Sequence, residues 1–315
     1  MLQNLRLKFT VRLPVTGKTI TLLEPIAAQR QGILNNFIAL LTSKEKLDDP
    51  KTNFELTYFI QESMFNYIRQ NIENADVDFL DVNEVIYFVL PLLELLANGW
   101  YLEDEIKCVK CESKMPVRFV FNPDLLAMKD AIDPENTNKL YATLIQNIKE
   151  LYFIEDDNFV PLYVVLPDKE LEKREIVKII KRTGDENLKV SVSFGHMLLK
   201  TYLQLLKSNL QNMQVSDIML SMLHKLEITN ENNTKLYLVY DAYNNIGDIQ
   251  KTIATLPENI YKLIESHLKQ YVSYYNETVT IGFKYDYICP YCNTENSNTF
   301  DAMQYFLKSV GLQAP

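Results

Sequence analysis

The sequence predicts an α+β fold that is mostly helical, with short antiparallel hairpins. Three observations support this prediction. Glycine is scarce, with only 8 in 315 residues, and long stretches carry apolar residues at helical spacing. Short alternating segments bounded by turn residues interrupt these stretches and are typical of strands. All four cysteines fall into two Cys-x-x-Cys motifs, each reached by a strand-like run, which is typical of zinc-ribbon knuckles.

Residues 1–125 are predicted to form an N-terminal segment that ends with the first knuckle. Its expected elements are a hairpin over 5–23, helices over 25–42, 52–73 and 82–98, and a knuckle hairpin over 103–121. Gly17 suits the hairpin turn, and Asn98-Gly99 suits the C-terminal cap of the third helix. The apolar core of that helix, residues 85–97, is too short to span a bilayer, so we expect it to be buried.

Residues 126–243 are predicted to be a helical middle region with a few short strands. The expected helices lie over 134–151, 168–182, 194–212 and 214–226, and the expected strands over 159–166 and 188–193. Residues 236–240 fit either the extension of a helix or a short strand. In 168–182, lysine and arginine alternate with glutamate, and we interpret this stretch as a solvated helix face.

Residues 244–315 are predicted to hold the second knuckle. The expected elements are helices over 244–255 and 257–274, a strand over 277–288 that leads into the knuckle, and a short helix over 300–307. In both halves of the chain a helix is followed by a strand that ends in Cys-x-x-Cys. We expect the three segments to pack as one unit.

The candidate site consists of the four cysteines, Cys108, Cys111, Cys289 and Cys292. Four thiolates suit a tetrahedral zinc ion, and no cysteine is left over. If both pairs hold one ion, the metal joins a point one third along the chain to a point near its end. Such a closed site has no open coordination position, so we expect it to stabilise the fold rather than to activate water.

Other interpretations of the two motifs are open at this stage. A thioredoxin-like redox motif needs a helix that starts at its second cysteine, whereas Cys111 leads into the strand-like Val117–Phe121. Disulfides are disfavoured in a chain with no signal peptide. Each pair could instead complete a site with another chain, or one or both pairs could hold no metal. One shared zinc ion requires the sulfurs of Cys111 and Cys289 to lie roughly 3.5–4 Å apart, because Zn–S bonds are near 2.3 Å.

Composition argues against several classes of function. The formal net charge is −9 and the pI is near 5.0, whereas a nucleic-acid-binding protein needs a basic stripe to hold phosphates. Residues 1–9 largely alternate polar and apolar side chains, as a strand does and a signal peptide does not. We therefore expect a soluble intracellular protein with no nucleic-acid partner and no membrane contact.

The sequence contains no convincing catalytic constellation. His196, His224 and His267 each fall in a stretch predicted to be helical, distant in sequence from one another and from the cysteines, so we interpret them as packing or surface residues. Gly17-Lys18-Thr19 is not part of a P-loop, because Arg12 occupies the position of the first glycine. The His-x-Glu of zinc deaminases is also missing. We expect neither enzymatic activity nor a small-molecule substrate.

Three blocks of the sequence carry a family resemblance. The first is the opening hairpin over Leu13–Pro25 with the helix after it. The second runs from Phe79 through the apolar helix to Cys111. The third runs from Asp248 through the second cysteine motif to the terminal Phe300–Phe306. In this order the blocks resemble the T4-type bacteriophage baseplate hub family, the hub subunit or hub assembly protein of contractile-tailed phages.

The resemblance spans both ends of the chain, and residues 130–240 lie outside it. Glu112 and Asn293 depart from the family at positions where a knuckle glycine is usual, although all four thiols are present. The resemblance implies a non-enzymatic component or assembly factor of the central baseplate hub, with other baseplate and tail hub proteins as partners. It implies a location in the virion tail baseplate, or in the host cytoplasm during assembly. The alternatives are a cellular zinc-ribbon adaptor and a zinc or thiol enzyme.

Overall fold

A computed structural model describes residues 6–42, 50–127, 133–182, 186–208 and 219–309. Within these ranges the chain is a mixed α+β protein with thirteen strands in four small sheets. Every strand pair is antiparallel except one, which confirms the predicted class and its hairpins. The expectation of a mostly helical protein is wrong, because four of the strands form a sheet in the middle region that was expected to be helical.

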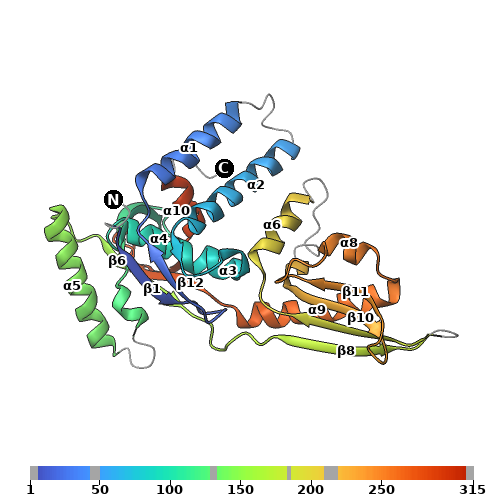
Figure 1. The fold of residues 1–315 in the computed structure, drawn as a ribbon. Helices are drawn as coiled ribbons and strands as arrows, with labels where there is room; N and C mark the ends of the chain where they lie inside the picture. The colour runs from blue at the N-terminus through green and yellow to red at the C-terminus, as the bar shows by residue number, and fades with distance from the viewer. Residues whose placement is uncertain (1–5, 43–49, 128–132, 183–185, 209–218, 310–315) are drawn as a thin grey trace.

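The N-terminal hairpin and two long helices form one side of the molecule, which we call the body. The elements are β1 (Lys8–Arg12), β2 (Thr19–Leu23), α1 (Ala27–Thr42), α2 (Pro50–Arg69) and β3 (Ile72–Glu73). The predicted hairpin is confirmed, and Gly17 adopts a φ of +66° in its turn, which glycine does without steric penalty. Helices α1 and α2 lie side by side and project from the rest of the body (Figure 1).

A buried helix runs through the centre of the body. It consists of α3 (Val82–Glu84), a π-helical turn over Val85–Val89, and α4 (Leu90–Ala97). The predicted buried helix and its C-terminal cap are confirmed, since Gly99 adopts a φ of +71°. The buried Glu94 accepts hydrogen bonds from Arg30 and from the Tyr67 hydroxyl, each 2.8 Å long, so its charge is paired.

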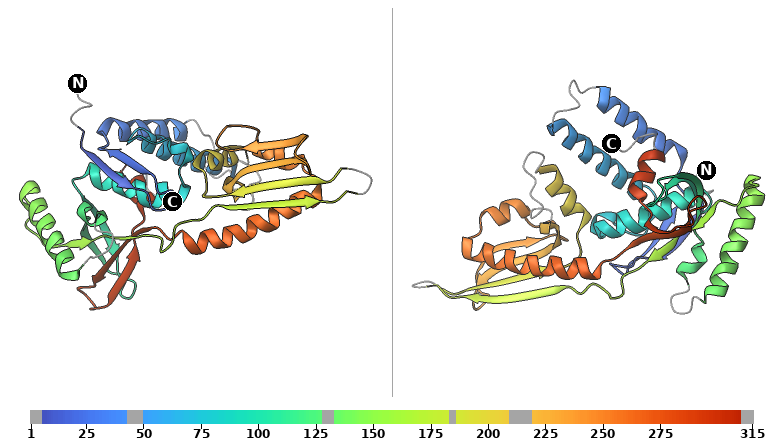
Figure 2. Two further views of the ribbon diagram at one scale, coloured as in Figure 1. Left: turned by 60° about the horizontal axis from the view of Figure 1, so that its bottom comes forward. Right: turned by 180° about the vertical axis from the view of Figure 1, so that it is seen from behind.

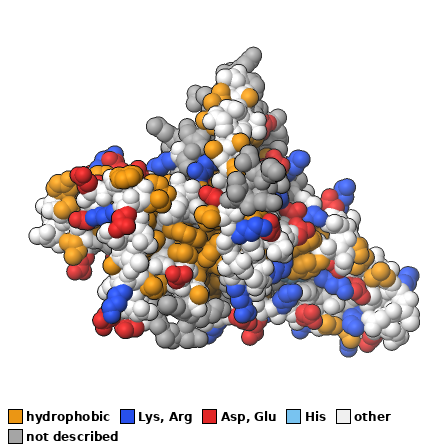
Figure 3. Space-filling model, turned by 60° about the vertical axis from the view of Figure 1, so that its left-hand side comes forward, with side chains coloured by type: hydrophobic (Ala, Val, Ile, Leu, Met, Phe, Trp, Pro, Cys, Tyr) orange, Lys and Arg blue, Asp and Glu red, His pale blue; other side chains and the backbone are white. Residues whose placement is uncertain are grey.

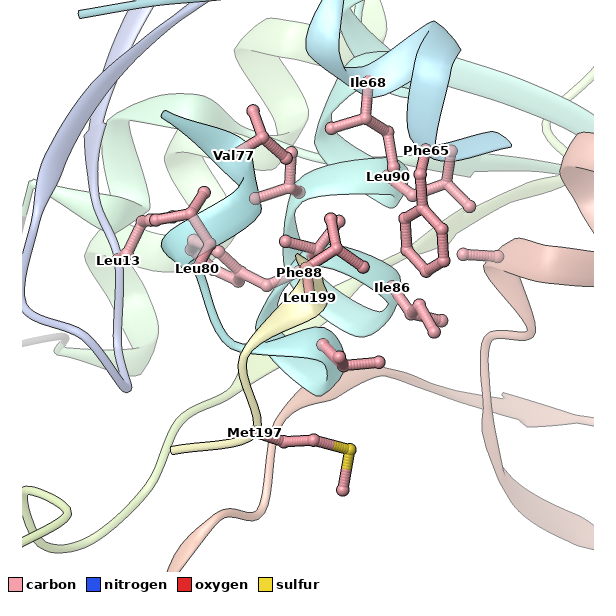
Figure 4. Packing of buried hydrophobic residues seen from close by; sticks show 14 of the residues in the cluster. Leu13, Phe65, Ile68, Val77, Leu80, Ile86, Phe88, Leu90, Met197 and Leu199 are labelled. Carbon is pink, nitrogen blue, oxygen red and sulfur yellow. The ribbon is translucent and has the colours of Figure 1, made fainter. Parts of the chain in front are cut away.

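The hydrophobic core is formed around this central helix. One continuous buried cluster contains residues from the first strand to the last helix. Figure 4 shows Leu13 of the hairpin beside Leu80, Phe65 of α2 beside Leu90, and Phe88 of the π-helical turn between them near Leu199. Parts of the chain that are distant in sequence therefore share the same core, and burial of their apolar surface holds them together.

Two three-stranded sheets carry the cysteine motifs. One contains β4 (Tyr101–Lys107), β5 (Lys114–Val120) and β6 (Phe159–Pro161), and the other contains β7 (Tyr163–Val165), β12 (Gly282–Ile288) and β13 (Glu295–Thr299). The predicted strand over 159–166 serves both sheets, because β6 pairs with β5 and β7 pairs with β12. Leu162, between them, is fully buried. This segment joins the two knuckle hairpins.

Aromatic side chains pack the two knuckle sheets against each other. The ring centroids of Phe119 and Tyr285 are 4.6 Å apart, and those of Phe121 and Phe283 are 5.3 Å apart. Phe119 lies in β5 and Phe121 directly follows Val120 at its end, whereas Tyr285 and Phe283 both lie in β12 of the second knuckle sheet. Such pairs stabilise beyond the area they bury. The aromatic layer therefore sets the position of one hairpin relative to the other.

A four-stranded sheet and three helices form a second part of the molecule, which we call the lobe. The strands are β8 (Arg174–Ile180), β9 (Leu188–Phe194), β10 (Leu223–Asn230) and β11 (Leu236–Asp241), and the helices are α6 (Leu199–Ser208), α8 (Ile249–Ala254) and α9 (Glu258–Thr278). Helix α9 lies along the sheet (Figure 2). The ring of Tyr271 in α9 stacks on that of Phe194 at 5.8 Å. The lobe is thus a sheet with its apolar face covered by helices.

The prediction of a charged helix over 168–182 is wrong, because the segment contains strand β8. Its β-branched residues Ile176, Val177, Ile179 and Ile180 favour a strand, and they outweigh the alternating charges. Ile176 pairs with Val192 and Ile180 pairs with the buried Leu188 of β9. Pairing with β9, the next strand along the chain, decides the conformation here.

The remaining elements agree with the sequence to different degrees. Helices α5 (Pro134–Tyr152) and α10 (Ala302–Ser309), strand β9 and the strand alternative for 236–240 are confirmed. Of the helix expected over 214–226, a 3-10 turn over Leu220–Met222 is present, and residues from 223 onward form β10 instead. Residues 214–218 lie outside the described part. The helices expected over 194–212 and 244–255 begin later in the structure, as α6 at Leu199 and α8 at Ile249; residues 209–212 lie outside the described residues.

Candidate metal centre

Two hairpin turns of the same shape present the four cysteines. The backbone N–H of Cys108 donates to the carbonyl of Ser113 at 3.0 Å, and that of Cys289 donates to the carbonyl of Thr294 at 2.9 Å. Strands β5 and β13 begin just after these turns. Both motifs are therefore strand–turn–strand, which the sequence predicts for the first motif only, since the strand after Cys292 was not expected. Neither has the helix at its second cysteine that a thioredoxin-like motif needs.

Glu112 and Asn293 turn the chain after the second cysteine of each pair. Both adopt the left-handed backbone conformation, with φ values of +58° and +53°. Their N–H groups donate to the carbonyls of Cys108 and Cys289 at 3.0 and 2.9 Å. This geometry explains why a knuckle usually has glycine at this position. Asparagine tolerates the conformation better than glutamate does.

The four sulfur atoms converge. The Sγ of Cys108 lies 3.7 Å from that of Cys292, the Sγ of Cys111 lies 3.6 Å from that of Cys289, and all four lie within 4.8 Å of one another. The edge of a tetrahedron with Zn–S bonds near 2.3 Å is roughly 3.8 Å, so the donors fit a zinc ion. None of the four forms a disulfide. The two pairs meet within one chain, and together they could hold a metal.

Burial and hydrogen bonding affect the thiols in opposite directions. Hydrogen bonds from the backbone N–H groups of Cys111 and Lys110 lower the pKa of the Cys108 thiol, and the Lys110 nitrogen lies 3.5 Å from its sulfur. Burial raises the pKa of the Cys289 thiol. A bound divalent cation would offset this desolvation, because it favours the thiolate form of every ligand. The arrangement therefore suits metal binding better than it suits four free thiols.

A hydroxyl group lies beside the second sulfur of each pair. Ser113 Oγ is 3.3 Å from Cys111 Sγ, and Thr294 Oγ1 is 3.2 Å from Cys292 Sγ. Groups that hydrogen-bond a ligating atom orient it and tune its basicity. The sequence analysis did not identify these two residues. Their signal was available, because both motifs extend to Cys-x-x-Cys-x-Ser/Thr.

Direct contacts between the knuckles complete the site. The buried Asn296 accepts a hydrogen bond from the backbone N–H of Val109 at 3.1 Å and donates one to the carbonyl of Thr294 at 2.8 Å. The Tyr287 hydroxyl donates to the carbonyl of Lys107 at 3.0 Å. These bonds position the two turns independently of a metal. No spacing in the sequence points to Asn296 or Tyr287.

The histidines are placed differently from the sequence prediction. His196 lies two residues after the end of β9 and His224 lies in β10, with their ring centroids 5.0 Å apart. The expectation of two separate helical positions is therefore wrong for this pair. The segments that carry the two histidines belong to the lobe sheet, whose strands were expected in part to be helices. His267 does lie on a helix, α9. Among the described residues no histidine or carboxylate joins the cysteine cluster.

Comparisons with protein-family models, curated proteins and solved structures give no match for this chain. In the part of the chain that the structure describes, no helix combines the length and the apolar character needed to cross a membrane. The functional interpretation of the site therefore rests on its geometry and on the resemblance of the three sequence blocks.

Proposed function

We propose that this protein is a structural component or assembly factor of the central hub of a contractile phage-tail baseplate, held together by a four-cysteine zinc site. The observation that carries the proposal is the convergence of four thiols from hairpins at distant points of the chain. A zinc ion with four thiolate ligands has no position for water or substrate. The ion would cross-link the fold, and the protein would act by presenting fixed surfaces to its partners.

The three resembling blocks supply most of the body and two helices of the lobe. They contain the N-terminal hairpin, the central helix with the first knuckle, and helices α8–α10 with the second knuckle. Residues 130–240, which lie outside the resemblance, contribute α5 and the strands of the lobe. The resemblance thus covers most of the body, the lobe helices α8 and α9, and all four cysteines, which are the parts that a zinc-linked hub scaffold would require.

Exposed apolar surface supports a role in protein assembly. At the end of α5, Leu151 is 67% exposed and Phe153 is 91% exposed. A groove of about 930 Å³ lies between the N-terminal hairpin and the segment over 166–171. Figure 3 shows hydrophobic side chains gathered in the hollow beside α5. Apolar surface of this kind is typical of protein interfaces, and we propose this face as a contact with neighbouring hub proteins.

Metal analysis of the purified chain tests the zinc site. One zinc per chain with four sulfur ligands by X-ray absorption is the expected result. Cys111→Ser should lose the zinc, whereas Lys110→Ala, an exposed change within the same turn, should keep it. A coordination shell with a water or nitrogen ligand would contradict the closed site and would favour a zinc enzyme instead.

Infection experiments test the hub role separately. Removal of the gene from its phage should give lysates without complete baseplates in electron micrographs. Expression of the wild-type chain or of Lys110→Ala should restore them, and Cys111→Ser should not. Infectious particles with normal tails from the deletion would contradict the hub role even if the zinc site were correct.

A further inference from the structure

A pocket at the junction of body and lobe combines two lysines with a buried histidine. Its volume is about 220 Å³. Lys18 comes from the N-terminal hairpin and Lys173 from the residue before β8, while His196 follows β9 and Tyr243 follows β11. Both parts of the molecule therefore contribute to its walls. The metal centre contributes none of the lining residues.

Among the described residues the two lysines form no ion pair, and the carboxylate that acts on the neighbouring Tyr243 and His224 is Asp241. Within the described residues neither Lys18 nor Lys173 lies within ion-pair distance of a carboxylate. Lys18 donates to the carbonyl of Phe79 at 3.3 Å, and Lys173 lies 5.6 Å from the ring centre of Tyr243. Two unpaired ammonium groups at one pocket attract an anion, although the chain as a whole carries a charge of −9.

A neighbouring carboxylate does not neutralise these lysines. Glu84 does not line the pocket, and its oxygens accept hydrogen bonds from the backbone N–H groups of Val15 and Thr16 and from the Thr16 hydroxyl. This carboxylate is thus bound to the hairpin turn. The pocket side of the turn presents the ammonium group of Lys18 instead.

Hydrogen bonds fix the tautomers of the paired histidines. His196 Nε2 lies 3.2 Å from the carbonyl oxygen of Phe79, and His224 Nε2 lies 2.8 Å from that of His196. A carbonyl oxygen only accepts, so each Nε2 carries a hydrogen and donates it. The Tyr243 hydroxyl donates to His224 Nδ1 at 3.1 Å. The remaining ring nitrogen, His196 Nδ1, has no protein partner among the described residues.

Electrostatics keeps the His196 ring neutral. Burial lowers its pKa to about 3, with further lowering from His224, Lys18 and Lys173. Both lysines line the same pocket as this ring. His196 Nδ1 is therefore an acceptor at neutral pH. A ligand for this pocket needs negative oxygens for the lysines and one O–H group for the histidine.

The histidine pair is held rigidly. A Cβ atom at Gly195 would lie 2.1 Å from His224 Cε1, so only glycine allows the chain to pass the second ring at this distance. The chain that carries His196 is thus packed directly on His224. The acceptor nitrogen keeps a defined position before any ligand arrives, which lowers the cost of binding.

We propose that this pocket binds inorganic hydrogen phosphate, with Lys18 and Lys173 contacting its negative oxygens and His196 Nδ1 accepting its O–H. Hydrogen phosphate carries two charges and one hydroxyl, which match the two lysines and the single acceptor. Sulfate has the same shape and charge but no hydroxyl, and a phosphate monoester dianion also lacks one. Because the body and the lobe both supply ligands, the bound anion would hold the two parts together.

Thermal unfolding of the full zinc-loaded chain at pH 7.5 tests the site. Sodium phosphate should raise the unfolding midpoint above that in sodium chloride of equal ionic strength, and sulfate or phosphoserine should raise it less. In calorimetric titration with phosphate, Lys18→Gln and Lys173→Gln should each weaken binding about tenfold. Lys178→Gln is the control, since this exposed lysine of β8 removes the same charge outside the pocket.

Nitrogen NMR of the three histidines provides a direct readout of the acceptor. Phosphate should shift the Nδ1 resonance of His196 and leave His267, on α9 outside the pocket, unchanged. Equal midpoints in phosphate and chloride, or equal weakening by Lys178→Gln, would overturn the site. Equal affinity for phosphate and sulfate, with no change at His196, would overturn hydrogen phosphate as the ligand.

Discussion

Glu112 occupies a backbone conformation that is unfavourable for its side chain. Its φ of +58° lies in the left-handed region, which costs a residue with a Cβ roughly 1–2 kcal/mol. Its ion pair with Lys107, 3.2 Å long, is exposed and contributes little. We predict that Glu112→Gly raises the free energy of unfolding of the zinc-loaded protein by about 1 kcal/mol, measured by urea denaturation.

A matched variant separates backbone strain from charge at this position. Glu112→Ala also removes the ion pair but retains the Cβ, so it should give no gain. Asn293→Gly should stabilise less than Glu112→Gly, because asparagine tolerates the left-handed conformation. Equal stabilisation by alanine and glycine at residue 112 would show that backbone strain is not the cause.

A single cysteine in the second knuckle should control the stability of the first. We predict that Cys289→Ser releases the zinc and speeds amide hydrogen exchange in the hairpin over Tyr101–Val120, because Cys289 and Cys111 share one cluster. Exchange mass spectrometry measures the effect. Pro290→Ala, in the same turn, is the control and should leave exchange near Cys108 unchanged. Unaltered protection of the first hairpin in Cys289→Ser would rule out a shared ion.

The first turn of the central helix holds two buried carboxylates. Asp81 caps the helix by accepting hydrogen bonds from the N–H groups of Asn83 and Glu84, and the Tyr275 hydroxyl of α9 donates to it at 2.7 Å. Glu84 binds the N-terminal hairpin through Val15 at 2.7 Å. Burial raises the pKa of Asp81 to about 6 and that of Glu84 to about 7. This turn therefore joins the hairpin, the central helix and α9.

The raised pKa of Glu84 predicts a pH-dependent stability. The folded protein binds the proton more tightly than the unfolded chain, so this contribution is present below about pH 4.5 and is lost as pH rises through about 7. As pH rises between these two pH values, the wild type should lose stability relative to Glu84→Gln. The difference between their unfolding free energies should grow by on the order of 3 kcal/mol in favour of the variant. Chemical denaturation across this pH range measures the difference.

The exposed Glu295→Gln provides the control for this measurement, and its difference from the wild type should stay flat. Subtraction of the wild-type curve also cancels the histidines. Burial lowers the pKa of His196 and of His224, so they destabilise the fold as pH falls. A flat difference for Glu84→Gln would mean that this carboxylate ionises freely in the fold.

Elements whose own residues decide their conformation could be predicted from the sequence. The central helix is apolar on all sides over Val85–Ala97, and only burial accommodates that pattern. Strand β8 carries charges on both faces and depends on pairing with β9. Strand β10, Leu223–Asn230, follows an apolar stretch that also fits a helix. For these strands pairing with a partner strand decides the conformation, and the pairing of β10 with β9 spans the residues between Phe194 and Leu223.

The ligands of the candidate site could be predicted from the sequence, but their meeting in space could not. The spacing within each pair indicates Cys108, Cys111, Cys289 and Cys292. Their meeting depends on the segment over 159–165, which pairs with both knuckle sheets, and on aromatic packing between these sheets. No local pattern encodes such contacts. Ser113 and Thr294 were visible as a repeated motif, whereas Asn296 and Tyr287 required the structure.

Zinc removal should affect the molecule unevenly. The ion would join the two knuckle hairpins, whereas contacts between α9 and the lobe sheet do not include the cysteines. We predict that a chelator lowers the unfolding midpoint and that both hairpins lose exchange protection together, while β8–β11 stays protected. Zinc should restore the midpoint and magnesium should not, because thiolates favour soft ions. An unchanged midpoint after complete zinc loss would contradict a stabilising role.

The position of the two knuckles in the chain imposes an order on events at the ribosome. Cys289 follows Cys111 by 178 residues, so the first pair leaves the ribosome well before its partner exists. At about 5–20 residues per second the delay is roughly ten to forty seconds. During that time the nascent chain offers only two of the four thiol ligands. Completion of the centre thus reports that the chain has been synthesised at least as far as Cys292.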